Sequence, residues 1–159
     1  MENSFNGVTF RLNGEVYAVD AMRVREIVGG AEWKPLSVEG SAQSFIQVRG
    51  KTVPVLDLRQ KFGFTPIGKE GLNSFVVVQG SGSHRDQQAA LWVDTVLEIV
   101  NVPPRDFHPL PASLKGERTK YLRVMIGDEG AEVFVLDVDR VLDQGVSVKK
   151  ELVLENKAV

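Results

Sequence analysis

Short apolar segments recur along the chain and are separated by residues that favour turns. Residues 8–12 alternate between apolar and polar types, and Asn13-Gly14 follows them before a second apolar segment at 16–19. An Asn-Gly pair in this setting predicts a tight hairpin, because both residues accept a positive φ. Further strands are predicted at 24–28, 45–48, 52–56, 75–78, 89–93, 96–100, 121–126 and 132–136. This spacing predicts an all-β protein, built either as small barrels or as a sandwich of two sheets.

One stretch combines a turn, a strand and a helical turn. Gly50 supplies the freedom that a tight reversal needs, and the β-branched and apolar residues 52–56 favour a strand. Asp57 follows as a helix N-cap, because its carboxylate accepts from the free N–H groups of the next turn. Leu58 and Phe62 are four residues apart, so both are expected to face the core from that turn.

The same pattern occurs twice. Residues 130–142 match 50–62 position by position, with identical Gly, Val, Val, Leu and Asp. A second pair of matching segments, 24–28 and 96–100, lies upstream in the same order, and each follows a Val-Asp pair. The order of the two matches predicts that the chain contains two copies of one structural unit.

We therefore predict a single domain, 1–159, in which two barrels of about five strands share an apolar seam. Their expected limits are 8–64 for subdomain 1 and 74–143 for subdomain 2. Residues 144–159 carry charges between scattered apolar residues and are expected to form either a frayed end or a short C-terminal helix.

Composition narrows the classes of protein that fit. The chain of 159 residues has a net charge of −2 and no run of like charges, which argues against nucleic-acid binding. It has no cysteine, so disulfides and thiolate chemistry are excluded. The start of the chain lacks a signal-peptide pattern, and no apolar run is long enough to span a membrane. A cytoplasmic protein without direct membrane insertion is expected.

Candidate catalytic chemistry is sparse. His84 lies in a Gly-Ser loop and His108 in a Pro-rich loop, so both are interpreted as solvated loop residues. The motifs of hydrolases, phosphate loops and zinc proteases are absent. Aspartates recur at matching places in the repeat, where turn capping explains them better than paired acid–base catalysis. We expect no enzyme activity, no metal site and no cofactor. The recurring aspartates are Asp20, Asp57, Asp94 and Asp137.

Pro54 points instead to a binding module. It lies in the middle of the predicted strand 52–56 and has no N–H to donate, so that strand is expected at a sheet edge or at a bulge. An exposed edge that carries Val53 and Val55 would be a natural docking surface. The alternative is that Pro54 only blocks unwanted strand pairing.

Taken in order, several of these segments resemble the CheW family, the adaptors of bacterial chemosensory arrays. The resemblance extends from Phe10 to Leu142. It implies two SH3-like five-stranded β-barrels and a protein without catalytic activity. The segments that carry it are Tyr17-Ala18-Val19, Val24-x-Glu26-Ile27, Val48-Arg49-Gly50, Val53-Pro54-Val55-Leu56-Asp57-Leu58-Arg59, Trp92-Val93-Asp94 with Val96-x-x-Ile99, and Leu136-Asp137.

The resemblance also implies partners and sites. Proteins of this family couple the cytoplasmic tips of chemoreceptors to the regulatory domain of the histidine kinase CheA, and a free monomer is expected. Gln47, Ser44, Phe45 and Ala90 depart from the usual family pattern, so the receptor and the pathway stay open. The resemblance pairs Glu26 with Arg49, and the carboxylate is expected to hold the guanidinium in a fixed pose. The implied receptor-binding residues are Glu26, Arg49, Phe75, Val76 and Ile99, and the implied kinase-binding residues are Val53, Pro54 and Val55.

Three other functions remain open at this point. One is a β-barrel domain that binds a ligand or acts as an enzyme, which a polar pocket beside His84 or His108 would favour. Another is a detached regulatory domain of a kinase. The third is a scaffold of a chemosensory pathway that does not serve flagella.

Overall fold

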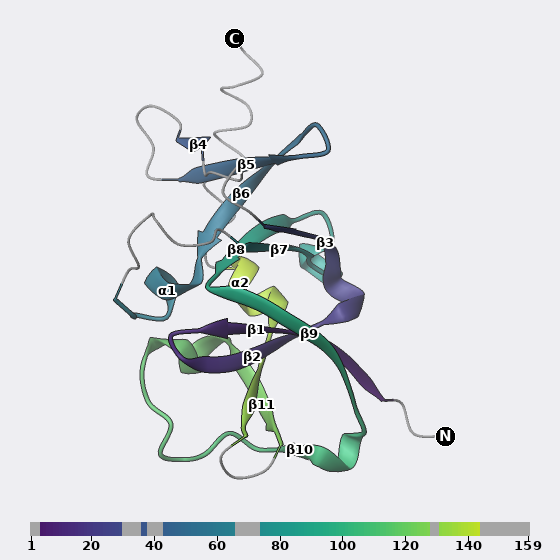
Figure 1. Cartoon of the computed structure of the whole chain (residues 1–159), viewed down its shortest axis with the longest axis vertical. Helices are drawn as coiled ribbons and strands as arrows, with labels where there is room; N and C mark the ends of the chain where they lie inside the picture. The colour runs from purple at the N-terminus through teal and green to yellow at the C-terminus, as the bar shows by residue number, and fades with distance from the viewer. Residues whose placement is uncertain (1–3, 30–35, 38–42, 66–73, 128–130, 144–159) are drawn as a thin grey trace.

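The computed structural model describes residues 4–29, 36–37, 43–65, 74–127 and 131–143 (Figure 1). Within these ranges the strands form two curled six-stranded sheets, which confirms the all-β prediction of two barrel-like lobes. Each sheet has one strand more than expected, because the two-residue strands β10 and β4 extend one edge. The expectations for residues 128–130 and 144–159 lie outside the described residues.

The first sheet has the strand order β10-β11-β12-β2-β1-β9, and the second has the order β3-β7-β8-β6-β5-β4. The strands of the first sheet are β1 (Phe5–Leu12), β2 (Glu15–Asp20), β9 (Thr95–Val102), β10 (Phe107–His108), β11 (Leu122–Ile126) and β12 (Val133–Leu136). Those of the second are β3 (Val24–Gly29), β4 (Leu36–Ser37), β5 (Ser44–Val48), β6 (Lys51–Asp57), β7 (Ser74–Gln79) and β8 (Gln88–Val93).

Each sheet mixes strands of both sequence units. The hairpin β1–β2 of the first unit lies beside β9 and β12 of the second unit, and β7–β8 of the second unit lies beside β3 and β6 of the first (Figure 1). In both sheets one strand of the hairpin joins its neighbour by a parallel ladder, β12 with β2 and β6 with β8, and the other strand joins by an antiparallel ladder, β1 with β9 and β7 with β3. Each unit therefore contributes its first hairpin to the sheet of the other unit. The limits 8–64 and 74–143 describe the repeat and do not separate the sheets.

Local sequence explains the turns. Asn13 and Gly14 join β1 to β2 with φ values of 54° and 80°, as the hairpin prediction requires. Asp57 accepts hydrogen bonds from the N–H groups of Arg59 and Gln60 at the start of helix α1 (Leu58–Lys61). Asp137 accepts from the Arg140 N–H in the equivalent helix α2 (Val138–Asp143). Both predicted caps are confirmed.

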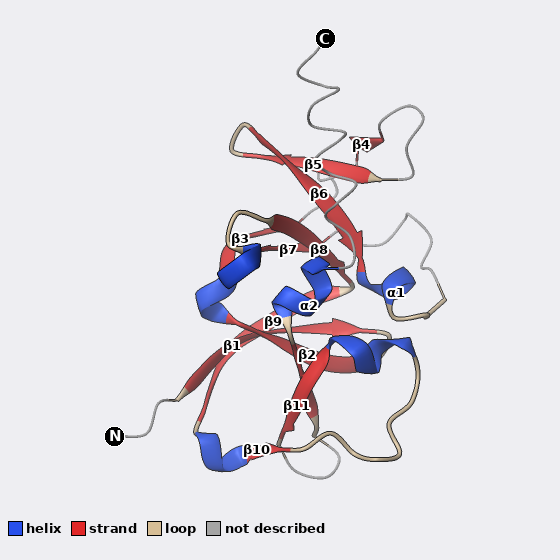
Figure 2. Ribbon diagram, turned by 180° about the vertical axis from the view of Figure 1, so that it is seen from behind, coloured by secondary structure: helices blue, strands red, loops and turns tan. Residues whose placement is uncertain are grey.

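The helical segments are all short, as Figure 2 shows. Among the described residues, no helix has the length and apolar character that a membrane span requires. Besides α1 and α2, single 3₁₀ turns are formed by Ala21–Arg23, Gly82–His84, Pro104–Asp106 and Glu117–Tyr121.

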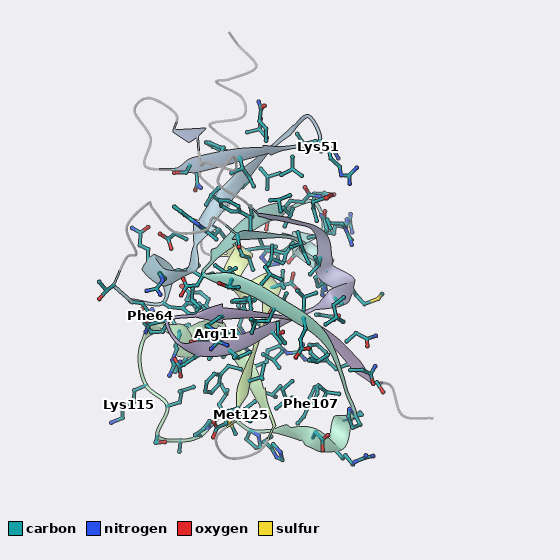
Figure 3. The ribbon with its side chains drawn as sticks, in the orientation of Figure 1. Arg11, Lys51, Phe64, Phe107, Lys115 and Met125 are labelled. Carbon is teal, nitrogen blue, oxygen red and sulfur yellow. The ribbon has the colours of Figure 1, made fainter. Side chains whose placement is uncertain are left out.

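The main core is shared between the two sheets, which confirms the predicted apolar seam. Phe10 and Tyr17 enter it from the first sheet, and Val76 and Leu91 enter it from the second. Side chains fill the space between the two sheets (Figure 3). A smaller core belongs to the second sheet alone. It comprises Val28, Ile46, Val48, Val53, Val55, Phe75, Val77 and Ala90.

The strand that contains Pro54 is not an edge strand. β6 lies between β5 and β8, and its register with β5 runs through Phe45↔Pro54 without a shift. The prediction of an edge or a bulge is therefore wrong for the strand as a whole. The proline is tolerated because the ladder with β8 begins only at Val55, one residue later, so the missing N–H interrupts no pairing.

Candidate functional site

The hairpin that joins β5 to β6 presents an arginine at its tip. Val48 pairs with Lys51, so Arg49 and Gly50 form a two-residue turn, with φ values of 51° and 78°. Two positive φ angles define the type I′ turn, in which Asn or Gly is usual at the first position. The Arg49 side chain is 79% exposed. The turn thus projects the Arg49 guanidinium from the surface, although the positive φ at this position disfavours an arginine.

Glu26 holds this guanidinium in one orientation. Nε of Arg49 donates to Oε2 of Glu26 at 2.7 Å, and Nη2 donates to Oε1 at 3.3 Å. Glu26 lies on β3, an outer strand of the second sheet, and its side chain is 24% exposed. Two parallel hydrogen bonds fix the plane of a guanidinium, whereas a single contact leaves it free to rotate. The contact expected between these two residues is present.

This contact affects the ionisation of Glu26. The hydrogen bond from Arg49, together with the guanidinium charge, lowers the pKa of Glu26 below its ordinary value of 4.5. A carboxyl group with a lowered pKa stabilises the folded state above its ordinary pKa, and this contribution disappears as pH falls through the folded value. The orientation of Arg49 is therefore expected to persist at neutral and mildly acidic pH.

We predict that a carboxyl-detected NMR titration will place the Glu26 midpoint below 4.5. In Arg49→Gln the midpoint should rise to the ordinary value, because the donor charge is gone. Arg25→Gln is the matched control, since Arg25 is an exposed neighbour on β3 that donates to the Met22 carbonyl. A wild-type midpoint at or above 4.5 would contradict the contact.

Of the other residues expected at the receptor site, one is exposed and two are buried. Ile99 lies on β9, an outer strand of the first sheet, and is 68% exposed. Phe75 and Val76 are fully buried, Phe75 against Trp92 in the smaller core and Val76 in the main core. Both lie on β7, directly beside β3, so in this structure they support the strand that carries Glu26.

The prediction of an exposed surface around Pro54 is wrong, because the side chains in this part of β6 are buried. Val53 and Val55 point from one face of β6 into the smaller core, and Pro54 is buried as well. The exposed side chains of this strand are those of Lys51 and Thr52. Alternation along the strand could not reveal this, because other elements cover both of its faces from Val53 onward.

Three exposed apolar residues were missed by sequence reasoning. Ile27 on β3, Leu97 on β9 and Met22 before β3 are solvent-accessible, and Met22 is 77% exposed. Ile27 occupies the place in the first unit that Ile99 occupies in the second, which was the available signal. β9 contacts β7, the neighbour of β3. Together with Ile99, these residues form what we call the exposed apolar set.

Two observations concern possible metal and ligand sites beside the histidines and carboxylates. No group of three or more His, Asp or Glu side chains is arranged to hold a metal in the described ranges. A hollow of about 250 Å³ lies beside His108, and four of its seven lining residues are the apolar Val100, Val102, Ile126 and Val133. It is not the polar pocket that the ligand-binding alternative would favour.

Comparisons with known proteins all point to one family. The sequence model of the family described as the CheW-like domain matches residues 6–146. The chain is 23% identical over 144 residues to the chemotaxis protein CheW of Treponema pallidum (strain Nichols), covering 87% of this chain and 82% of the relative. It is 27% identical over 138 residues to the chemotaxis protein CheW of Klebsiella aerogenes, covering 84% and 78%.

Among solved structures, the fold is similar to the crystal structure of scaffolding protein TtCheW from Thermoanaerobacter tengcongensis. The TM-score is 0.69 at 24% sequence identity, and the match covers 84% of this chain and 89% of that chain. The likeness supports the assignment of the fold.

Proposed function

This chain belongs to the CheW-like domain family, and we propose from that premise that it is a non-catalytic chemotaxis adaptor. In this proposal it couples the cytoplasmic tips of chemoreceptors to the regulatory domain of the histidine kinase CheA. The relatives named chemotaxis protein CheW support the adaptor role. The structural observation that carries the receptor assignment is the oriented Arg49–Glu26 pair at an exposed hairpin tip.

The receptor surface combines that charge with apolar contacts. A receptor tip presents a helical hairpin, and a helix docks through one apolar face. The exposed apolar set provides a complement to such a face, with Ile99 as its member on the first sheet and Ile27 on the second. The exposed N–H groups of Arg49 would then bind a carbonyl or carboxylate of the receptor. Phe75 and Val76 act in this proposal as the support beneath β3.

The kinase contacts are proposed at the start of β6, where Lys51 and Thr52 are exposed, and the buried Val53, Pro54 and Val55 that follow hold this strand in place. In the described ladders, Lys51 to Pro54 pair with β5 only, because the β8 ladder starts at Val55. The exposed side chains of Lys51 and Thr52 on this half-strand are the proposed contacts with the kinase. The proposal also includes a cytoplasmic location, a free monomer, and no nucleic acid, cofactor or metal.

Co-sedimentation tests the proposal directly. Purified chain is mixed with a receptor cytoplasmic fragment alone, with the CheA regulatory domain alone, and with both together. We expect capture by each partner and a ternary complex, without turnover of ATP by the chain. Failure to bind either partner, together with a thermal shift produced by small metabolites, would instead support the ligand-binding alternative.

Ile99→Asp is expected to weaken receptor capture about tenfold or more, since burying a large apolar side chain contributes about 1.5–3 kcal/mol. Because Ile99 is highly exposed, the free energy of unfolding should change by only about 0.5 kcal/mol or less. Binding isotherms with the receptor fragment and urea unfolding measure the two quantities.

Thr52→Asp is the matched control, as it places the same charge at an exposed position on β6. It should weaken capture of the kinase domain and leave receptor capture unchanged. If Ile99→Asp and Thr52→Asp impaired both partners equally, the assignment of two separate surfaces would be wrong.

A further inference from the structure

The two equivalent helices carry charged residues at the same position. Because residues 50–62 align with 130–142, Arg59 of α1 and Asp139 of α2 occupy equivalent places in the two units. Each is the second residue of its helix. Both side chains reach the opposite sheet, and they do so with opposite charge.

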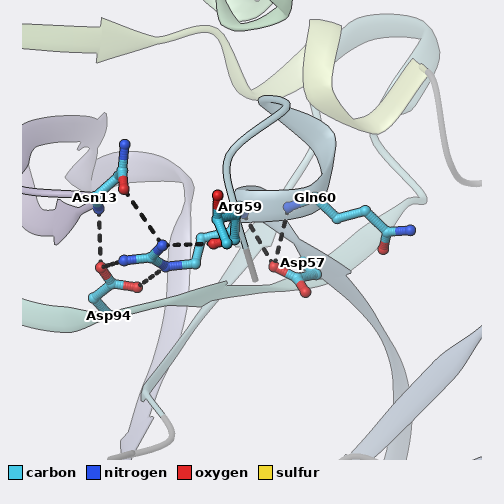
Figure 4. A network of polar contacts seen from close by, with 6 residues as sticks. Asn13, Asp57, Arg59, Gln60 and Asp94 are labelled. Atoms are coloured by element: carbon cyan, nitrogen blue, oxygen red, sulfur yellow. Dashed lines mark hydrogen bonds and ion pairs between the residues drawn. The ribbon is translucent and has the colours of Figure 1, made fainter. Parts of the chain in front are cut away.

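Arg59 binds the connection between β8 and β9, where the chain passes from the second sheet to the first (Figure 4). Its Nε donates to Oδ1 of Asp94 at 2.7 Å, and its Nη2 donates to Oδ2 at 2.5 Å. Oδ2 of Asp94 also accepts from the Asn13 N–H at 2.9 Å, in the β1–β2 turn. Both charged side chains are mostly buried, at 15% and 17% exposure. We call this set the α1 latch.

Asp139 makes the corresponding contacts at the other connection. It accepts from the Ser81 N–H at 2.8 Å and from the Ser81 hydroxyl at 2.7 Å, in the β7–β8 loop of the second sheet. Nη2 of Arg23 lies 3.6 Å from Oδ2 of Asp139. Arg23 ends the 3₁₀ turn through which the chain passes from the first sheet to the second. We call this set the α2 latch.

A second contact joins α2 to the β7–β8 loop. Nε2 of His84, in the same β7–β8 loop, lies 3.0 Å from Oδ1 of Asp143 at the end of α2. The His84 side chain is only 20% exposed, so its interpretation as a solvated loop residue is wrong. The contact with α2, which is distant in sequence, accounts for this burial.

The two latches therefore have equivalent arrangements, in which the helix residue is positively charged in one and negatively charged in the other. Each helix binds near the turn of the hairpin that its own unit contributes to the other sheet, and each binds a connection between the sheets. We infer that the two latches fix the orientation of the first sheet relative to the second, and thereby hold β3 and β9 at their relative position.

The latches add directional contacts to the burial of the shared core. Apolar burial is non-directional, so it favours contact between the sheets over a range of angles. A bidentate arginine–carboxylate pair has a fixed geometry, and a carboxylate that accepts two hydrogen bonds from one serine is similarly constrained. Burial by itself would raise the pKa of Asp94, but the hydrogen bonds from Arg59 and Asn13 outweigh it and lower that pKa. The ionised pair is thus the stable state at neutral pH.

Arg59 and Asp139 act here as positioning residues, since neither belongs to the proposed partner surface. The consequence for receptor binding rests on the proposed function. The orientation of the sheets does not rest on the proposed function, and it can be measured in the isolated chain.

Because the chain has no cysteine, spin labels can be placed at two introduced cysteines only. Gln47→Cys on β5 and His108→Cys on β10 are exposed positions in different sheets. Double electron–electron resonance then gives the distribution of distances between the labels. We expect a single narrow distribution in the otherwise unaltered chain, a broader one in Arg59→Gln and in Asp139→Asn, and the broadest in the double variant.

Arg140→Gln is the matched control, because Arg140 contacts Asp137 and the Leu122 carbonyl within its own sheet. It should leave the distribution unchanged. Arg59→Lys keeps the charge without the bidentate geometry and should give an intermediate width, which provides a readout if the glutamine variant is unfolded. A distribution that stays narrow in Arg59→Lys and in every folded variant of Arg59 and Asp139 would overturn the inference.

Receptor capture by the same variants is the second measurement. We expect about fivefold weaker capture by the double variant and unchanged capture by Arg140→Gln. If the unaltered chain captured no receptor fragment, the proposed function would fail, while the distance distributions would still test the latches. Broadened distributions with unchanged capture would restrict the role of the latches to the orientation of the sheets and remove the link to β3 and β9.

Discussion

Arg49→Glu is expected to lower the affinity for a receptor tip by about thirtyfold or more, because a central arginine of an interface commonly contributes about 2 kcal/mol or more. The substitution removes the two hydrogen bonds to Glu26 and places two carboxylates beside each other at the hairpin tip. It also replaces the donor groups that the proposed receptor contact requires. Kinase binding should be retained, since the proposed kinase contacts lie on β6, after the turn that carries Arg49.

Binding isotherms with a receptor fragment and with the CheA regulatory domain measure the two effects separately. Arg25→Glu makes the same charge reversal at an exposed position on β3 and should weaken receptor binding less. Arg49→Asn keeps a residue that tolerates the left-handed turn, so it separates the loss of the side chain from backbone strain. Equal loss of both partners in Arg49→Glu would count against the assignment of the receptor surface.

Phe10→Ala is expected to lower the free energy of unfolding by about 3–5 kcal/mol, the usual cost of removing a buried phenylalanine ring. Phe10 is fully buried in the shared core and stacks on Tyr17 with ring centroids 5.8 Å apart. This loss is a large part of the stability of an ordinary domain. Because the core belongs to both sheets, the second sheet should be destabilised together with the first.

Trp92 provides a probe of that coupling. It lies on β8 of the second sheet, and Trp33→Phe would leave it as the only tryptophan. In urea, Trp92 fluorescence and far-ultraviolet circular dichroism should shift together to a lower midpoint in Phe10→Ala. Arg11→Ala, at the exposed neighbouring position, should leave both midpoints nearly unchanged. A Trp92 transition that stayed at the wild-type midpoint would show that the sheets unfold independently.

Residues of the candidate site differ in how well the sequence could place them. The contact between Glu26 and Arg49 was implied by the family resemblance and is present. The turn signal at Gly50 placed the arginine at a hairpin tip. The exposure of residues on neighbouring strands was not predictable in the same way. Phe75, Val53 and Val55 are covered by elements that are distant along the chain, and periodicity reports only which residues share a face.

Local chemistry explains what the sequence determined by itself. The hairpin at Asn13-Gly14, the caps at Asp57 and Asp137, and the strands between them depend on backbone preferences and hydrogen bonds within a few residues. The repeat is visible for the same reason, since each unit encodes the same local elements. All of these predictions are confirmed.

The exchange of hairpins was decided only by the tertiary structure. The two units have equivalent apolar patterns, so the first hairpin of each can pair beside the parallel strand of either unit with the same alternation. What distinguishes the two arrangements is non-local: the course of the connections at Arg23 and Asp94, and the polar contacts that Asp139 and Arg59 make with them. Such contacts join residues that are 35 or more positions apart, which is beyond the reach of any local pattern.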